Sequence, residues 1–147
     1  MFKSAVYAFI LLVLTCTSCA PLSGSPSKEG LLLEQQSLVR WRVDENILEV
    51  YAVIANYADK DASFAAYVVF LDPHLREIDG LDRIEVKEDD RKGKTPFLLK
   101  PYQETVLRQR FYMDEPLKRA WLSKGVGIEI ATEGKRMTLP IKYVEIR

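Results

Sequence analysis

Apolar and polar residues alternate along much of the chain, and this period of two predicts β-strands rather than helices. Between residues 38 and 43, apolar side chains alternate with Arg40 and Arg42, which predicts a strand with one buried face. Residues 64–71 are apolar on both faces. In residues 47–55, one face carries Leu48, Val50, Ala52 and Ile54, and the other carries Ile47, Glu49, Tyr51 and Val53. We therefore expect each of these two segments to form an interior strand of a sheet.

The second half of the chain continues the alternation in shorter segments. The further predicted strands cover residues 83–87, 96–99, 105–111, 126–130 and 137–143. Outward charges make 83–87 an expected edge strand, and Pro140 predicts that the last strand lies at an edge or carries a bulge. The segment 115–123 departs from the pattern. Its acidic start, early proline, spaced apolar residues and following Gly125 predict one short helix.

Seven or eight short strands with turn residues between them predict a mainly all-β fold, an antiparallel β-sandwich, as one domain over residues 31–147. The chain lacks the Cys–Trp–Cys spacing of antibody domains. The stretch Leu48–Leu71, two long strands joined by a short polar turn and ended by Asp-Pro, resembles the immunoglobulin-like or fibronectin-III-like domains of many bacterial envelope lipoproteins. That resemblance implies an architecture and no particular function.

The first residues have the composition of a secretion signal. Lys3 supplies a positive start, and Ala5–Leu14 is an apolar or small run. This run is much shorter than the ~20 residues that span a bilayer, and no later segment is long enough either. We expect residues 1–18 to be a signal peptide.

The end of the signal resembles the lipobox of bacterial lipoproteins, in which an apolar-small-small pattern precedes a cysteine that becomes lipidated. Thr17 and Ser18 fit the small positions before Cys19, whereas Cys16 stands where an aliphatic residue is usual. Pro21 disfavours ordinary cleavage after residue 20. The resemblance implies lipidation at Cys19. The alternatives are lipidation at Cys16 and a secreted protein without lipid.

Residues 19–30 would then be the lipidated cysteine followed by a flexible tether rich in Ser, Pro and Gly. In lipoproteins of two-membrane bacteria, an aspartate after the cysteine favours retention in the inner membrane, and this chain has Ala20. We therefore expect an outer-membrane anchor facing the periplasm rather than the inner membrane.

The composition argues against several classes of function. Basic and acidic residues balance, 21 of each, so no basic excess favours nucleic acid as a partner. A zinc site needs about four ligands, and the chain has only two cysteines and His74. We expect no metal and no cofactor.

No catalytic motif accompanies the candidate acids and bases. His74 follows a strand end, where a solvated turn histidine is expected, and Asp89 and Asp90 lie in a charged run typical of a loop. No nucleophile elbow, P-loop or dinucleotide fingerprint is present. The sequence therefore predicts a protein that is not an enzyme. A hydrolase that uses His74 or surface carboxylates remains an alternative.

Four arginines form the candidate binding site. Arg40, Arg42, Arg108 and Arg110 point outward from two predicted strands and would form one patch if those strands were neighbours. Guanidinium groups recognise carboxylates and phosphates through paired hydrogen bonds. The alternative is that each arginine covers the sheet with its stem and pairs with an acidic residue on the next strand.

These observations together predict a lipid-anchored cell-envelope protein that acts as a non-catalytic binding or assembly module. It would be a structural or accessory subunit of an envelope complex, with a protein partner. The alternative is a periplasmic small-ligand carrier or sensor with a pocket between the sheets or under the predicted helix.

Overall fold

The computed structural model describes residues 30–80, 82–87 and 96–147. The predicted signal peptide, Cys16, Cys19 and nearly all of the predicted tether lie outside these residues, as do Asp89 and Asp90. Within the described ranges, no helix has the length and apolar character needed to cross a membrane.

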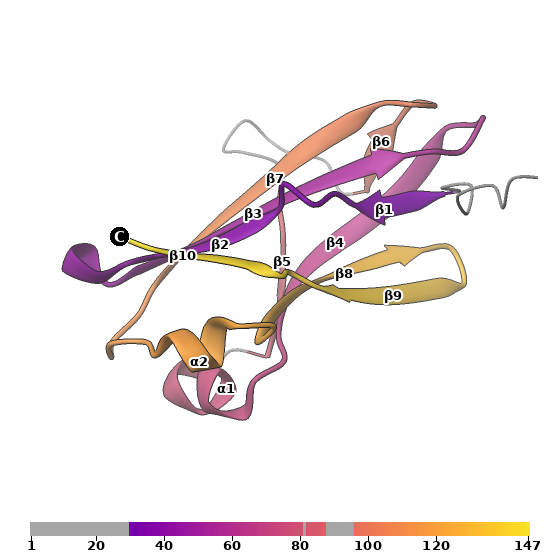
Figure 1. Ribbon diagram of the computed structural model, residues 1–147. Helices are drawn as coiled ribbons and strands as arrows, with labels where there is room; N and C mark the ends of the chain where they lie inside the picture. Colours follow the sequence, from indigo (N-terminus) through magenta and orange to yellow (C-terminus); the bar gives the residue numbers. More distant parts are fainter. Residues whose placement is uncertain (1–29, 81, 88–95) are drawn as a thin grey trace, which may run out of the picture.

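Two sheets make up most of the described chain (Figure 1). The strands of the first sheet are β1 (Leu31–Leu33), β2 (Leu38–Arg42), β3 (Ile47–Asn56), β7 (Glu104–Tyr112) and β10 (Tyr143–Ile146). β3 lies in the middle and pairs antiparallel with β7 along one side and with β1 and β2 along the other. β10 pairs with β2 in parallel and forms an edge. The predicted central position of the strand over 47–55 is confirmed.

The second sheet is organised around a second long strand. Its strands are β4 (Ala62–Phe70), β5 (Arg83–Glu85), β6 (Phe97–Leu99), β8 (Val126–Thr132) and β9 (Lys135–Pro140). β4 pairs with β8 on one side and with the short strands β5 and β6 on the other, and β9 pairs with β8. All of these pairings are antiparallel. The interior position predicted for 64–71 is confirmed.

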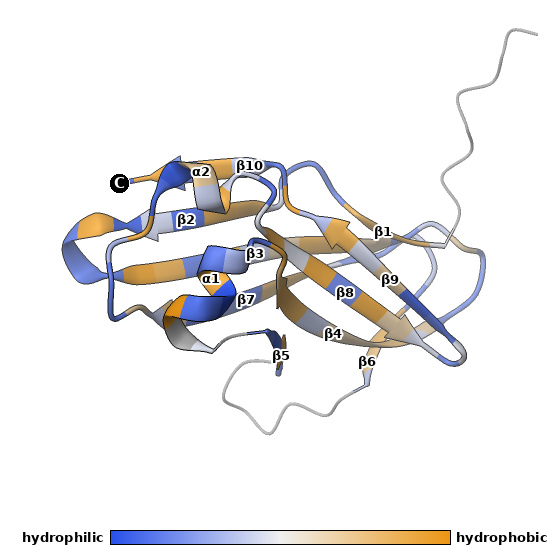
Figure 2. Ribbon diagram, turned by 90° about the horizontal axis from the view of Figure 1, so that it is seen from below, coloured by the Kyte–Doolittle hydropathy of each residue, from blue (hydrophilic) through white to orange (hydrophobic). Residues whose placement is uncertain are grey.

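The two sheets share one apolar core. Alternate residues of β3 and β4 are buried in it, and Figure 2 shows the apolar residues that recur along these two strands. Phe70 of β4 and Phe111 of β7 meet edge to face across the core, with ring centres 5.3 Å apart. The fold is therefore mostly β, with two sheets that pack against each other as predicted for a sandwich.

The last predicted strand divides in two. Residues 137–143 were expected to form a single strand, but β9 ends at Pro140 in the second sheet and β10 begins at Tyr143 in the first. Proline has no N–H to donate to a ladder, and the next residue, Ile141, is buried and bonds through its N–H to the carbonyl of Val126. The chain changes sheet at this point, which produces the one parallel pairing among the described strands.

The helices also differ from the expectation. The helix predicted over 115–123 is only the single turn α2 (Arg119–Leu122). A second helix, α1 (Pro73–Asp79), was missed because Asp72-Pro73 was interpreted only as the end of a strand. The Asp72 side chain accepts a hydrogen bond from the His74 N–H and caps this helix, and proline is well tolerated at the first helical position.

Candidate functional site

The outward face of the first sheet gathers the predicted arginines. β2 and β7 are not neighbours, because β3 lies between them, but their arginines meet over the outward residues of β3. Arg40 of β2 and Arg110 of β7 both stand opposite Glu49, and Arg108 stands opposite Tyr51. Period-two alternation had already placed Glu49 and Tyr51 on one face of a central strand. It did not show that this face also carried the arginines.

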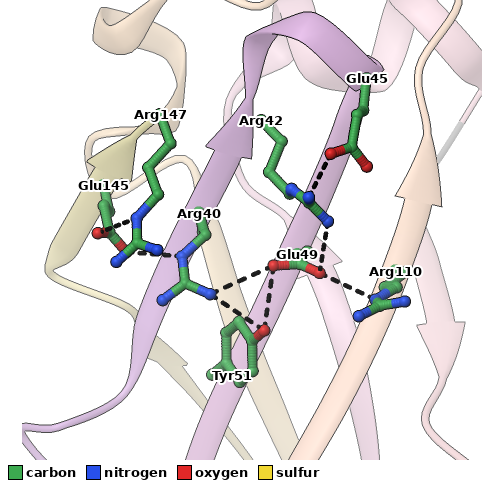
Figure 3. Close-up of polar contacts among 8 residues, drawn as sticks. All are labelled: Arg40, Arg42, Glu45, Glu49, Tyr51, Arg110, Glu145 and Arg147. Carbon is green, nitrogen blue, oxygen red and sulfur yellow. Dashed lines mark hydrogen bonds and ion pairs between the residues drawn. The ribbon is translucent and has the colours of Figure 1, made fainter.

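Glu49 is the centre of this face. Its side chain is only 2% exposed. One carboxylate oxygen accepts from the Tyr51 hydroxyl at 3.0 Å and from Arg40 at 3.4 Å, and the other lies 2.9 Å from Nε of Arg110 (Figure 3). Arg42 is more distant from this second oxygen, at 3.9 Å. A buried carboxylate without such partners would be strongly destabilising.

The arginines keep Glu49 ionised. Burial by itself raises the pKa of the Glu49 carboxyl, but the hydrogen bond from Tyr51 and the charges of Arg110, Arg40 and Arg42 act in the opposite direction. The net effect is a pKa below the ordinary value. Glu49 is therefore a fixed negative charge at neutral pH, and it holds three guanidinium groups in place around it.

Arg40 connects the edge strand β10 to Glu49. Its Nε donates to Glu145 of β10 at 2.6 Å, and Glu145 also accepts from Nε of Arg147 at 2.6 Å. The hydrogen bond to Glu145 is the main cause of the raised pKa of Arg40, and the same bond lowers the pKa of Glu145. These contacts thus link β10, β2, β3 and β7, four of the five strands of the first sheet.

Two further arginines complete the face. Arg42 forms an ion pair with Glu45, which lies in the 3₁₀ turn η1 (Val43–Glu45) between β2 and β3. The guanidinium carbon of Arg108 lies 4.8 Å from the ring centre of Tyr51, a cation–π contact. Within the described part of the chain, Arg108 has no carboxylate partner.

We call the eight residues of Figure 3 the Glu49 cluster; they are Arg40, Arg42, Glu45, Glu49, Tyr51, Arg110, Glu145 and Arg147. A hollow of about 420 Å³ opens over this cluster, lined by seven of these residues together with Asp44. Its polar, charged lining suits a polar or charged ligand or partner group better than an apolar one. Both sequence interpretations of the arginines are thus partly met: they gather on one face, and three of them pair with Glu49.

The other sheet carries a smaller polar arrangement that the sequence reasoning missed. The guanidinium of Arg83 lies 3.3 Å from the ring centre of Tyr67 and bonds to Glu129 through two nitrogens, at 2.8 and 3.0 Å. A hollow of about 290 Å³ lies beside it. Both hollows open on outward sheet faces, so neither corresponds to the ligand pocket predicted between the sheets.

His74 lies in the first turn of α1 rather than in the turn that was predicted. Its ring is exposed, stacks on Trp121 with centres 5.1 Å apart, and has Nδ1 3.1 Å from the Asp72 carboxylate. The stacking of His74 on Trp121 joins α1 to α2. The described residues include no group of three or more His, Cys, Asp or Glu side chains placed to hold a metal ion.

Comparison with known proteins finds no matching family model and no matching curated protein. Among solved structures, the alkylpurine DNA glycosylase AlkC of Pseudomonas fluorescens, bound to DNA containing an abasic site analog, matches with a TM-score of 0.43 and 8% sequence identity. The match covers 80% of this chain and 31% of that chain, so this protein spans about a third of the glycosylase's length. A likeness of this size carries no argument about fold or activity.

Proposed function

We propose that this protein is a lipid-anchored cell-envelope protein whose domain acts by binding another envelope protein, without catalysis, as a structural or accessory subunit of a complex. The anchor is proposed at Cys19, on the periplasmic side of the outer membrane. The proposal is supported by the leader pattern, by the tether composition of residues 19–30 and by the outward face of the first sheet.

The single observation that carries the binding role is the Glu49 cluster. A buried ion pair is an inefficient way to stabilise a fold, because desolvation of the charges offsets much of their attraction. An apolar residue at position 49 would cover a sheet face more simply. Placing a buried carboxylate among three arginines on an open face makes physical sense if the arginines must be held in fixed positions for a partner.

We also propose that the two sheets form an immunoglobulin-like or fibronectin-III-like sandwich. The central antiparallel pairs β3–β7 and β4–β8 support this assignment, as does the shared apolar core between the sheets. Such sandwiches commonly present outward sheet faces and end loops to other proteins, which agrees with a binding role.

Photocrosslinking in intact cells tests the proposed function. A photoreactive amino acid replaces Tyr112, which is exposed on the outward face beside the cluster, in the full-length protein. The matched control replaces Arg136, an exposed residue of β9 on the other sheet. We expect a specific protein adduct at position 112 and not at position 136. No adduct at position 112, or the same adduct at both, would count against this function.

A further inference from the structure

Exposed residues of β7 point outward in a single row, which begins at Glu104 and continues with four more. Val106, Arg108, Arg110 and Tyr112 occupy alternate positions and stand opposite the outward residues of β3. Val106 is 59% exposed, the Arg110 side chain 50% and Tyr112 76%. We call these four residues the β7 stripe. Its order is apolar, basic, basic, aromatic, with about 6.8 Å between successive members, as in any antiparallel strand.

The two arginines of the stripe have unused hydrogen-bonding capacity. Arg110 contacts Glu49 through Nε, and its terminal nitrogens have no hydrogen bond within the part of the chain that the structure describes. Arg108 lies over Tyr51 and has no ion pair there. Each is held on its inner side, by Glu49 or by the tyrosine ring. Little side-chain freedom is therefore lost when an outer partner binds.

We infer that the β7 stripe binds an extended acidic segment of the partner protein, in which two carboxylates occupy alternate positions. This inference rests on the proposed binding function and names the chemistry of the partner. Side chains on one face of an extended segment repeat at the same spacing as those of β7. Two such carboxylates meet Arg108 and Arg110, and apolar side chains beyond them meet Val106 and Tyr112.

The surroundings of the stripe favour a narrow acidic ligand over a broad anionic surface. Glu104 is exposed at one end of β7, and Glu45 and Glu145 lie on the same side of the sheet. These carboxylates would repel a membrane surface or a nucleic acid laid across the whole face. A segment that runs along β7 avoids Glu145, which lies three strands away on β10.

Two peptides of equal composition test the spacing. The full-length protein in detergent is titrated by fluorescence anisotropy at low salt with Val-Thr-Asp-Thr-Asp-Thr-Val and with Val-Thr-Thr-Asp-Asp-Thr-Val. Adjacent aspartates of an extended peptide point to opposite faces, so only the first peptide presents both carboxylates to the stripe. We expect the first peptide to bind several-fold more tightly. Equal affinities, or no binding of the first peptide, would overturn the inference.

Matched variants test the residues. Arg108→Gln should weaken binding of the alternating peptide by about five- to tenfold, and Arg136→Gln should leave it unchanged. Arg108→Lys keeps the positive charge. The peptide affinity of this variant supplies a second measurement if Arg108→Gln melts at a lower temperature than the wild type. Unchanged affinity in both Arg108 variants would overturn the inference, as would selective binding to anionic phospholipid vesicles in place of the peptide. A crosslinked partner at position 112 combined with equal peptide affinities would leave the binding function standing and remove only the acidic segment.

Discussion

Nε of Arg110 lies 2.9 Å from a carboxylate oxygen of Glu49, directly across the β7–β3 register. The Glu49 side chain is buried while that of Arg110 is half exposed. The carboxylate is therefore fixed beneath the surface of the sheet, and the guanidinium of Arg110 faces solvent. Arg40 approaches the other oxygen of the same carboxylate from β2. This arrangement makes Glu49 the residue on which the position of the arginines depends.

Replacing Glu49 should therefore destabilise the fold. Glu49→Gln keeps the shape but leaves Arg40, Arg42 and Arg110 close together without their shared counter-charge. We expect the free energy of unfolding to fall by about 2–4 kcal/mol, measured by urea denaturation. Glu45→Gln, which removes an exposed partner of Arg42, should cost less than about 1 kcal/mol. Equal stability of wild type and Glu49→Gln would contradict the central position of this carboxylate.

The same carboxylate should make stability depend on acid pH. The pKa of Glu49 is lowered in the folded state, so below its ordinary value of 4.5 the unfolded chain takes up a proton that the folded chain does not. Stability from this group is complete above pH 4.5 and is lost as the pH falls through the folded pKa. Glu145, whose pKa is lowered by Arg40 and Arg147, acts in the same direction.

Urea denaturation as a function of pH checks this dependence. Between pH 4.5 and pH 3 the unfolding free energy of the wild type should fall more steeply than that of Glu49→Gln. Parallel pH profiles for the two proteins would show that Glu49 does not titrate differently in the folded and unfolded states.

Gly125 should tolerate no side chain. A Cβ at this position would lie 1.7 Å from the Trp121 carbonyl oxygen and 2.9 Å from the Cβ of Asp72. The carbonyl oxygen of Gly125 accepts hydrogen bonds from the N–H groups of Leu71 and Asp72, so the backbone at Gly125 is not free to move away. We expect Gly125→Ala to lower the unfolding free energy by about 3 kcal/mol or more.

Gly127→Ala is the matched control. Its added Cβ would lie 3.0 Å from the Leu139 carbonyl oxygen and 3.2 Å from the flexible Leu71 side chain, much farther than the 1.7 Å at Gly125. Its cost should be clearly smaller in the same thermal or urea measurement. A Gly125→Ala protein as stable as the wild type would show that Gly125 does not lie this close to the Trp121 carbonyl oxygen and Asp72.

The anchor has its own test. Cys19→Ser should remove the lipid, so the protein should leave the membrane fraction, and intact-mass measurement should show no diacylglycerol. Cys16→Ser should leave both mass and partition as in the mature wild type. Loss of the lipid in Cys16→Ser and not in Cys19→Ser would assign the anchor to the other cysteine.

The period-two pattern was sufficient to predict the interior strands, because β4 is apolar on both faces and β3 carries apolar residues on both. Two features could not be derived from it. Alternation tells which residues share a face of one strand but not which strands are neighbours, so the meeting of Arg40 and Arg110 over Glu49 was missed. The helix α1 was missed because Asp72-Pro73 fits both a strand end and a helix start, and its seven residues give too few turns for a clear helical period.

One measurement tests most directly whether the outward face of the first sheet is the binding surface. It is the yield of the crosslinked adduct at position 112 in intact cells, measured in the Arg108→Gln and the Arg136→Gln variants and compared with the wild type. Arg108→Gln alters this face without removing an ion pair of the described chain, and Arg136→Gln makes the same change on the other sheet. The account predicts a yield that falls several-fold with Arg108→Gln and is unchanged with Arg136→Gln. An undiminished yield with Arg108→Gln, or an equal fall with both, would contradict it.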